Sequence, residues 1–409
     1  MDSGNFAWSI AATALVLFMT PGVAFFYGGL VKAKSVVSMM MMSFGAMGLI
    51  SVLWILYGFN MSLGGGSLAF AGNPFGPEGQ NFALANLDSA TLIGAAFGAT
   101  FAIITVALIS GAIADRAKFG SWLIFAGLWA TIVYFPVAAW VWGDGWILNF
   151  GGNTGLPSVI DYAGGTAVHI NAGAAALALA IVLGKRVGFA KGAHKPHNVP
   201  LTLLGASILW FGWFGFNAGA EGTFGLLGPE NTGAGLIVVN TIGATAAAIL
   251  GWIIIEKIKD GKATSVGAAS GAVAGLVAIT PSCANLEPGW ALLLGIIAGA
   301  LCALAVELKF KLGFDDSLDV VGIHMVGGFI GTIYLGFFAI GTGLFVGGDA
   351  GQLASQTVAA FAVAIYSFIV ALILGFAIEK TIGFRVKNED EVAGVDVAVH
   401  GEEGYALVD

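Results

Sequence analysis

The chain has 409 residues, of which 58% are hydrophobic and only 10% are charged, and its mean hydropathy is +0.91. Soluble domains carry about 25% charged residues, so this composition excludes an ordinary soluble protein and indicates an integral membrane protein. The net charge of −8 offers no basic surface for nucleic acid, and two cysteines, Cys283 and Cys302, do not build a disulfide framework.

Apolar windows long enough to cross a bilayer as helices, about 20 residues each, follow one another along the chain. They cover residues 6–30, 39–60, 91–114, 121–142, 163–183, 200–219, 234–256, 265–282, 289–307, 320–340 and 357–380. The first window is longer than a signal peptide and is followed, not preceded, by Lys32 and Lys34, so we interpret it as a mature helix. The sequence therefore predicts an all-α integral membrane protein with eleven transmembrane helices.

The basic residues predict the orientation of these helices. All sixteen Lys and Arg residues lie in alternate connections, and the other connections, including the long one at 61–90, contain none. Because Lys and Arg collect in cytoplasmic loops, we expect the N-terminus outside and the C-terminus inside the cytoplasmic membrane. Residues 1–384 are then a transmembrane domain, and residues 385–409, whose charged side chains are mostly acidic, form a cytoplasmic tail.

Two histidines stand inside otherwise apolar helices: His169 in DYAGGTAVHINAG and His324 in DVVGIHMVGG. An ionisable ring within a bilayer helix is costly, so both are expected to face a pore or a protein interior. The predicted topology makes their helices antiparallel, with both rings near the midplane. An inverted repeat of five plus five helices, with one extra helix, would place them in this way. Buried histidines with a purely structural role are the alternative.

Three acidic residues have local interpretations. Asp161 precedes Ala-Gly-Gly at the start of the helix that carries His169, where a carboxylate can accept hydrogen bonds from free amides. Asp319 is expected to cap the helix of His324 in the same way. Asp115, next to Arg116, is expected to lie in a solvated loop.

The chain resembles a known family, the ammonium transporter, methylammonium permease and Rhesus protein family, and most closely its bacterial ammonium transporters. The resemblance covers nearly the whole chain in the expected order. It rests on TPGVAFFYGGLVKAK (20–34), FAIITVALISGAIADR (101–116), DYAGGTAVHINAG (161–173), HNVPLTLLGASILWFGWFGFNAG (197–219), DDSLDVVGIHMVGG (315–328) and GFRVKNEDEVAGVDVAVHG (383–401). It implies a homotrimer of eleven-helix protomers, each with its own pore.

The resemblance also implies roles for individual residues. His169 and His324 would line the pore, Phe101 and Phe216 would gate its outer end, and Trp142, with Phe101, would recruit the substrate. Asp161 would be required near the outer vestibule for its hydrogen bonds. The alternatives are ordinary packing for the phenylalanines and an interfacial position for the tryptophan.

One position departs from the family pattern. Many relatives carry a serine after FNAG, whose hydroxyl helps to hold the incoming cation, whereas this sequence has Ala220 followed by Glu221. The resemblance therefore implies an outer site that lacks this hydroxyl, and we predict weaker outer binding of ammonium.

The function implied is transport, not enzymatic catalysis, and no cofactor or metal is expected. In the mechanism implied, ammonium is recruited outside, loses its proton and crosses as ammonia, and the overall transport is electrogenic. Whether methylammonium is also a substrate is left open. The family also implies a P-II nitrogen-regulatory protein as a partner at the cytoplasmic face. Two other classes of protein are alternatives to a transporter. The first is a membrane enzyme or electron carrier with histidine-bound metal or haem, although no cysteine or carboxylate completes a ligand set. The second is an ammonium sensor.

Overall fold

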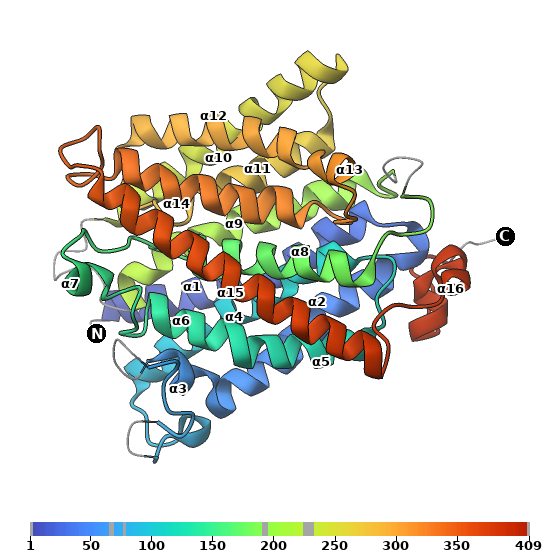
Figure 1. Ribbon diagram of the computed structural model, residues 1–409, viewed down its shortest axis with the longest axis horizontal. Helices are drawn as coiled ribbons and strands as arrows, with labels where there is room; N and C mark the ends of the chain where they lie inside the picture. The colour runs from blue at the N-terminus through green and yellow to red at the C-terminus, as the bar shows by residue number, and fades with distance from the viewer. Residues whose placement is uncertain (1–2, 65–68, 77–78, 190–194, 224–232, 407–409) are drawn as a thin grey trace.

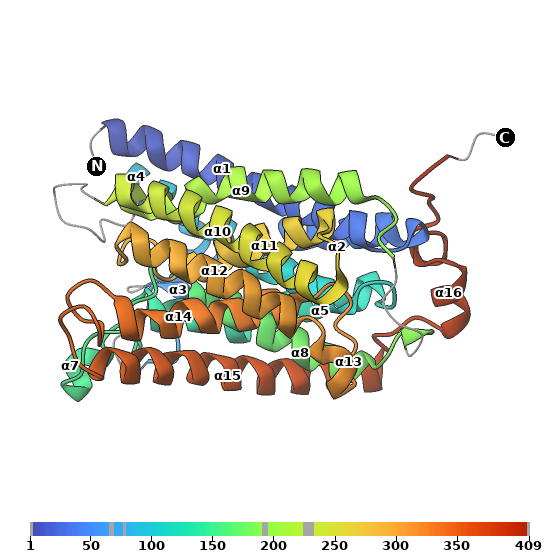
Figure 2. The same ribbon diagram turned by 90° about the horizontal axis from the view of Figure 1, so that it is seen from above.

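The computed structural model describes residues 3–64, 69–76, 79–189, 195–223 and 233–406. Within these residues the regular structure is helical, and the one β-type pairing is a bridge between Ala117 and Arg385. The long helices form an elongated bundle, in which α1 begins at one end and α16 lies at the other (Figures 1 and 2). This placement agrees with an odd number of crossings.

The α-helices of the described residues are α1 (Ser3–Leu30), α2 (Val36–Leu53), α3 (Phe59–Ser62), α4 (Ser89–Ile109), α5 (Phe119–Trp129), α6 (Phe135–Val141), α7 (Phe150–Thr154), α8 (Asn171–Leu183), α9 (Val199–Thr223), α10 (Ala234–Asp260), α11 (Ser265–Ile279), α12 (Pro288–Ala305), α13 (Leu308–Leu312), α14 (Val326–Phe338), α15 (Gly351–Thr381) and α16 (Asn388–Ala393). Short π-helical turns join several of them into longer rods: Trp54–Gly58, Ala130–Tyr134, Gly165–Ile170 and Val321–Met325.

Ten rods in the described part of the chain are long and apolar enough to cross a membrane, and they confirm ten of the predicted windows. The remaining window, 265–282, contains α11, which at 15 residues is shorter than the other crossings. It gives way to turns just before Pro281, because a proline disfavours helical geometry in the residue that precedes it. The count of eleven crossings therefore stays a prediction.

The outside of the bundle is apolar along its length. On α15, Ile365, Ile369 and Ile373 are exposed at four-residue intervals, and on α10 Leu250 and Ile254 are exposed in the same way. Such continuous apolar surface is unfavourable in water but suits contact with lipid tails. The chain is thus a multi-pass membrane protein.

The two rods that carry the histidines cross at glycines. A Cβ atom on Gly173 would lie 2.5 Å from the backbone nitrogen of Met325, and one on Gly328 would lie 3.0 Å from the carbonyl oxygen of Gly165. Each glycine follows its histidine by four residues. Small residues let membrane helices approach this closely, and the crossing brings the two histidines together.

The end of the bundle that holds Arg116, Arg186 and Arg385, here called the basic end, contains a buried ionic network. Arg186 pairs with Asp115 at 3.0 Å and with Asp315 at 2.9 Å. Burial would raise the pKa of Asp315, but the hydrogen bonds and charge of Arg186 hold it below its ordinary value. This structure corrects the expectation of a solvated loop at Asp115 and Arg116, because three distant loops dock on one another and bury both side chains.

Arg116 is fully buried in this network. Its guanidinium donates to the hydroxyl of Ser317 at 2.5 Å and to the backbone carbonyl of Asp315 at 2.6 Å. Burial lowers its pKa to about 10, so it still carries its charge at neutral pH.

The tail folds back onto the basic end. Glu391 accepts a hydrogen bond from the backbone nitrogen of Val187 at 2.6 Å and pairs with Arg385 at 2.7 Å. The carboxylate of Asp396 accepts from the backbone nitrogens of Val37 and Ser38 at the start of α2. The tail thus caps the start of α2 through Asp396 and holds the loop after α8 through Glu391.

Candidate functional site: an aromatic stack above paired histidines

His169 and His324 lie side by side in the centre of the bundle. Their Nδ1 atoms are 3.3 Å apart, and the rings are nearly parallel, with centroids 5.4 Å apart and an interplanar angle of 22°. Both side chains are buried. The Nε2 atom of His169 has no hydrogen-bond partner among the described residues. The pair therefore presents polar ring nitrogen atoms to an otherwise apolar interior.

Each histidine sits on a π-helical turn, a feature that recurs at functional sites because it re-aims side chains. The turn of His169 begins under the carboxylate of Asp161. That carboxylate accepts hydrogen bonds from the backbone nitrogens of Gly164, Gly165, Thr166 and Ala167 at 2.6–3.2 Å, and from the Thr166 hydroxyl. Asp161 thus anchors the segment that positions His169.

The equivalent residue in the other rod is Asp316, which corrects our expectation for Asp319. Asp316 is buried and accepts a hydrogen bond from the backbone nitrogen of Val321 at 2.7 Å, at the start of the π-helical turn. Asp319 instead forms an ion pair with Lys309 at 2.5 Å. Asp161 and Asp316 each precede a histidine by eight residues, a match that was visible in the sequence.

An aromatic stack closes the space above the histidines. The rings of Phe101 and Phe216 are stacked, with centroids 4.2 Å apart and an interplanar angle of 25°. Phe216 also stacks on His169 at 6.1 Å, and Trp213 stacks on the same imidazole at 5.6 Å. The structure therefore brings together the two phenylalanines that the family resemblance implies as a gate.

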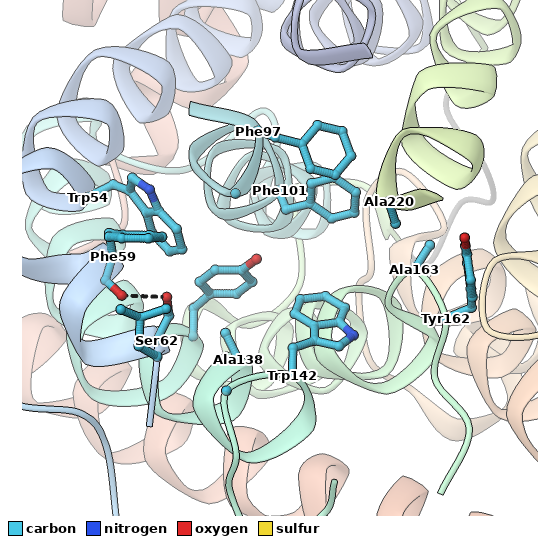
Figure 3. Close-up of a pocket in the computed structure, with 14 residues that line it drawn as sticks. Trp54, Phe59, Ser62, Phe97, Phe101, Ala138, Trp142, Tyr162, Ala163 and Ala220 are labelled. Carbon is cyan, nitrogen blue, oxygen red and sulfur yellow. Dashed lines mark hydrogen bonds between the residues drawn. The ribbon is translucent and has the colours of Figure 1, made fainter. Parts of the chain in front are cut away.

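A cavity of about 170 Å³ opens on the other side of this stack. Figure 3 shows Phe101 and Trp142 facing it from different helices, with Ala220 and Tyr162 along a further wall. The indole of Trp142 donates to the backbone carbonyl of Asp161 at 2.9 Å, which fixes the orientation of its ring. We call this space the vestibule. Ala220 lines it and contributes no side-chain hydroxyl.

A second cavity of only about 10 Å³ lies below the stack. Both histidines line it, together with apolar and aromatic side chains: Val23, Phe26, Tyr27, Ile104, Leu108, Val168, Leu209, Trp213, Phe216 and Val273. This volume holds about one water molecule. We call it the histidine chamber; its size suits a small neutral molecule better than a hydrated ion.

Three residues of this site were not singled out from the sequence. Trp213 lies three positions before Phe216, but nothing in the sequence distinguishes it from the other ten tryptophans. The sequence analysis assigned the capping role to Asp319 instead of Asp316. Tyr162 follows Asp161, but no sequence pattern marks it as part of a site. In the described residues, no three His, Cys, Asp or Glu side chains come together in a group that could hold a metal ion.

A vestibule, an aromatic stack and a chamber with two histidines, following one another inside a multi-pass membrane bundle, have the layout of a selective pore for a small solute. Comparison with known proteins identifies the group. The model of the Ammonium Transporter Family matches residues 7–405, so the chain belongs to this family.

Individual relatives agree with this assignment. An ammonium transporter of Mycobacterium tuberculosis (strain H37Rv) is 52% identical, over 99% of this chain and 90% of its own length. Ammonium transporter Amt1 of Archaeoglobus fulgidus is 39% identical, over 99% of this chain and all of its own. Among solved structures, Candida albicans Mep2 superposes with a TM-score of 0.84 at 32% identity, covering 99% of this chain and 91% of that one. A structure named Sensor Amt Protein superposes with a TM-score of 0.86 at 28% identity, covering 97% and 98%.

Proposed function

We propose that this protein transports ammonium across the cytoplasmic membrane, taking up the cation in the vestibule and passing ammonia through the histidine chamber. The observation that carries the proposal is the Phe101–Phe216 stack, which separates an aromatic-walled cavity from the chamber of His169 and His324. The relatives named as ammonium transporters support the choice of substrate.

The vestibule suits a cation. Trp142 and Phe101 present aromatic surface to it, and the face of an aromatic ring attracts a cation that has shed part of its water. The chamber beyond is too small for a hydrated ion and is mostly apolar. Because moving a bare cation into such surroundings has a large solvation penalty, ammonium transfers its proton to the accepting Nε2 atom of the histidine pair as it passes the stack, and it crosses as neutral ammonia.

The paired histidines suit the neutral molecule. For one Nδ1 to donate to the other across 3.3 Å, one ring must carry its proton on Nδ1 and the other on Nε2. The two Nε2 atoms then differ: one accepts a hydrogen bond and the other donates one. Ammonia can do both, so the pair can hold it in turn, and a proton can move through the Nδ1 contact, which makes transport electrogenic overall.

The test is ammonium-evoked current from proteoliposomes on a solid-supported membrane. We expect a transient current with ammonium chloride and none with an equal step of sodium chloride. Replacing both histidines (His169→Ala with His324→Ala) should abolish it, with correct assembly checked by size-exclusion chromatography. Undiminished current in the double variant would refute the histidine relay, and no current in the wild type would refute transport of charge.

We further propose that the protein is a homotrimer, with the vestibule outside and the basic end and the tail (385–409) inside. A P-II protein is the proposed regulatory partner. The inverted repeat is supported by the matched spacing of Asp161 to His169 and Asp316 to His324. Native mass spectrometry tests the trimer, and a pull-down with the host's P-II protein, with and without 2-oxoglutarate, tests the partner. A sensing role would be additional to transport.

A further inference from the structure

Glu221 is a buried acidic residue beside the vestibule that the mechanism above does not use. Its side chain is only 5% exposed, and neither carboxyl oxygen has a hydrogen-bond partner among the described residues. None of the ion pairs in the described part of the chain includes it. A buried carboxylate is unfavourable unless it is paired with a positive charge.

The protein has no positive side chain to offer there. The Lys and Arg residues lie in alternate connections, and the connections on the vestibule side have none. Glu221 lies near the end of α9 that is opposite the basic end (Figures 1 and 2). A cation that neutralises this carboxylate must therefore come from the solution.

The surroundings of Glu221 are rich in acceptors of hydrogen bonds. Asn217, one turn earlier on the same face of α9, donates to Thr241 at 3.0 Å, and its Oδ1 atom has no partner among the described residues. The buried hydroxyl of Tyr162 is also without a partner there. Burial, and secondarily the negative charge of Glu221, raise the pKa of this phenol, so Tyr162 keeps its proton and can orient its oxygen as an acceptor.

One member of this set lines the vestibule, and Glu221 follows a residue that does. Tyr162 and Ala220 both line the cavity, and Glu221 is the next residue along α9 after Ala220. Figure 3 shows the hydroxyl end of Tyr162 on the same side of the cavity as Ala220. Ammonium carries one positive charge and four N–H donors, so it is complementary to a carboxylate with neighbouring acceptor oxygens.

We propose that Glu221, together with the hydroxyl of Tyr162, forms a cation site at the edge of the vestibule that recruits ammonium in place of the hydroxyl that Ala220 lacks. This inference rests on the proposed transport function. The carboxylate attracts the cation and holds it beside Trp142 and Phe101 until the proton is lost. The site acts on capture, so it sets the concentration dependence of transport more than its maximal rate.

The experiment measures ammonium-evoked current over a concentration series for the wild type, Glu221→Gln and Tyr162→Phe. We expect Glu221→Gln to raise the half-saturating ammonium concentration at least tenfold while the maximal current stays within twofold. Tyr162→Phe, which removes one hydroxyl, should raise it by about two- to fivefold. Glu287→Gln is the matched control, since it removes an exposed carboxylate that makes no capping hydrogen bond, and it should behave like the wild type.

Half-saturation unchanged within twofold in both Glu221→Gln and Tyr162→Phe would overturn the site. If Glu221→Gln does not assemble, Tyr162→Phe decides: a wild-type concentration dependence overturns the proposal, and a raised one supports it. A purely structural role would lower the thermal stability of the purified protein without moving half-saturation, which also overturns it. Absence of any current in the wild type would instead be a failure of the proposed transport function.

Discussion

Replacing Asp161 with asparagine removes one of the two oxygens that anchor the turn of His169. Oδ1 of Asp161 accepts from Gly164 and Gly165, and Oδ2 accepts from Thr166 and Ala167. An asparagine keeps one acceptor and turns an NH₂ group toward the other two amides. Two buried N–H groups without an acceptor cost about 1–3 kcal/mol each, so the free energy of unfolding should fall by about 2–6 kcal/mol.

Asp316→Asn is the matched comparison. The Asp316 carboxylate accepts from the Val321 amide through Oδ2, and its Oδ1 has no partner among the described residues. The asparagine can turn its oxygen toward Val321 and keep that bond, so at about pH 4, where Asp316 is protonated, its destabilisation should be below about 1 kcal/mol. Thermal unfolding in detergent, followed by tryptophan fluorescence, compares the two variants. Asp161→Asn should also lose most of the ammonium current, because its turn positions His169.

Equal stability of Asp161→Asn and the wild type would refute this reasoning, since it would mean that the amides find other acceptors. A loss in Asp316→Asn as large as that in Asp161→Asn would also refute it. In that case the number of hydrogen bonds to the carboxylate would not set the energetic difference between the two turns.

Three further predictions follow from the same geometry. Ala220→Ser should lower the ammonium concentration for half-maximal current by a few-fold, the effect of about one added hydrogen bond; an unchanged value would contradict the role of the missing hydroxyl. Gly173→Ala should reduce the yield of folded protein in size-exclusion chromatography, because its Cβ would lie 2.5 Å from the Met325 nitrogen, whereas Gly48→Ala, with no atom within 4 Å, should not. Burial raises the pKa of Asp316 to about 6, so the folded protein binds a proton there that the unfolded chain releases from about pH 4 upward. Wild-type stability should therefore fall by roughly 3 kcal/mol as pH rises from 4 to above 6, and Asp316→Asn should lack this component; parallel pH profiles of unfolding would refute it.

The helices of this protein were predictable because a bilayer imposes a length and a composition on each crossing. The window at 265–282 is the exception, since α11 ends at Ile279 before Pro281 and the chain continues as turns. The hydropathy window extends three residues, slightly less than one helical turn, beyond the last residue of α11.

The site was predictable only in part. His169 and His324 stood out because ionisable rings are rare in apolar helices, and Phe101 and Phe216 came from family resemblance, since the sequence alone does not separate them from the other phenylalanines. The ionic network was missed because Arg186 meets Asp115 and Asp315 across 71 and 129 residues of chain. Local patterns carry no information on such contacts, which depend on how loops dock.

The aromatic stack has a consequence for the electrical behaviour of the membrane. Because Phe101 and Phe216 are in contact, the polarisable aqueous path from the vestibule side stops at their rings. The transmembrane voltage then falls over the segment that contains the histidine chamber, where a moving proton does work of about 2.3 kcal/mol per 100 mV. An inside-negative potential of that size would bias a proton-coupled step inward by roughly 50-fold. For the proposed electrogenic transport, the closed stack therefore decides where along the path the voltage acts, and it places this work at the histidine pair; the total electrical work on a proton that crosses the whole membrane is the same for any field profile.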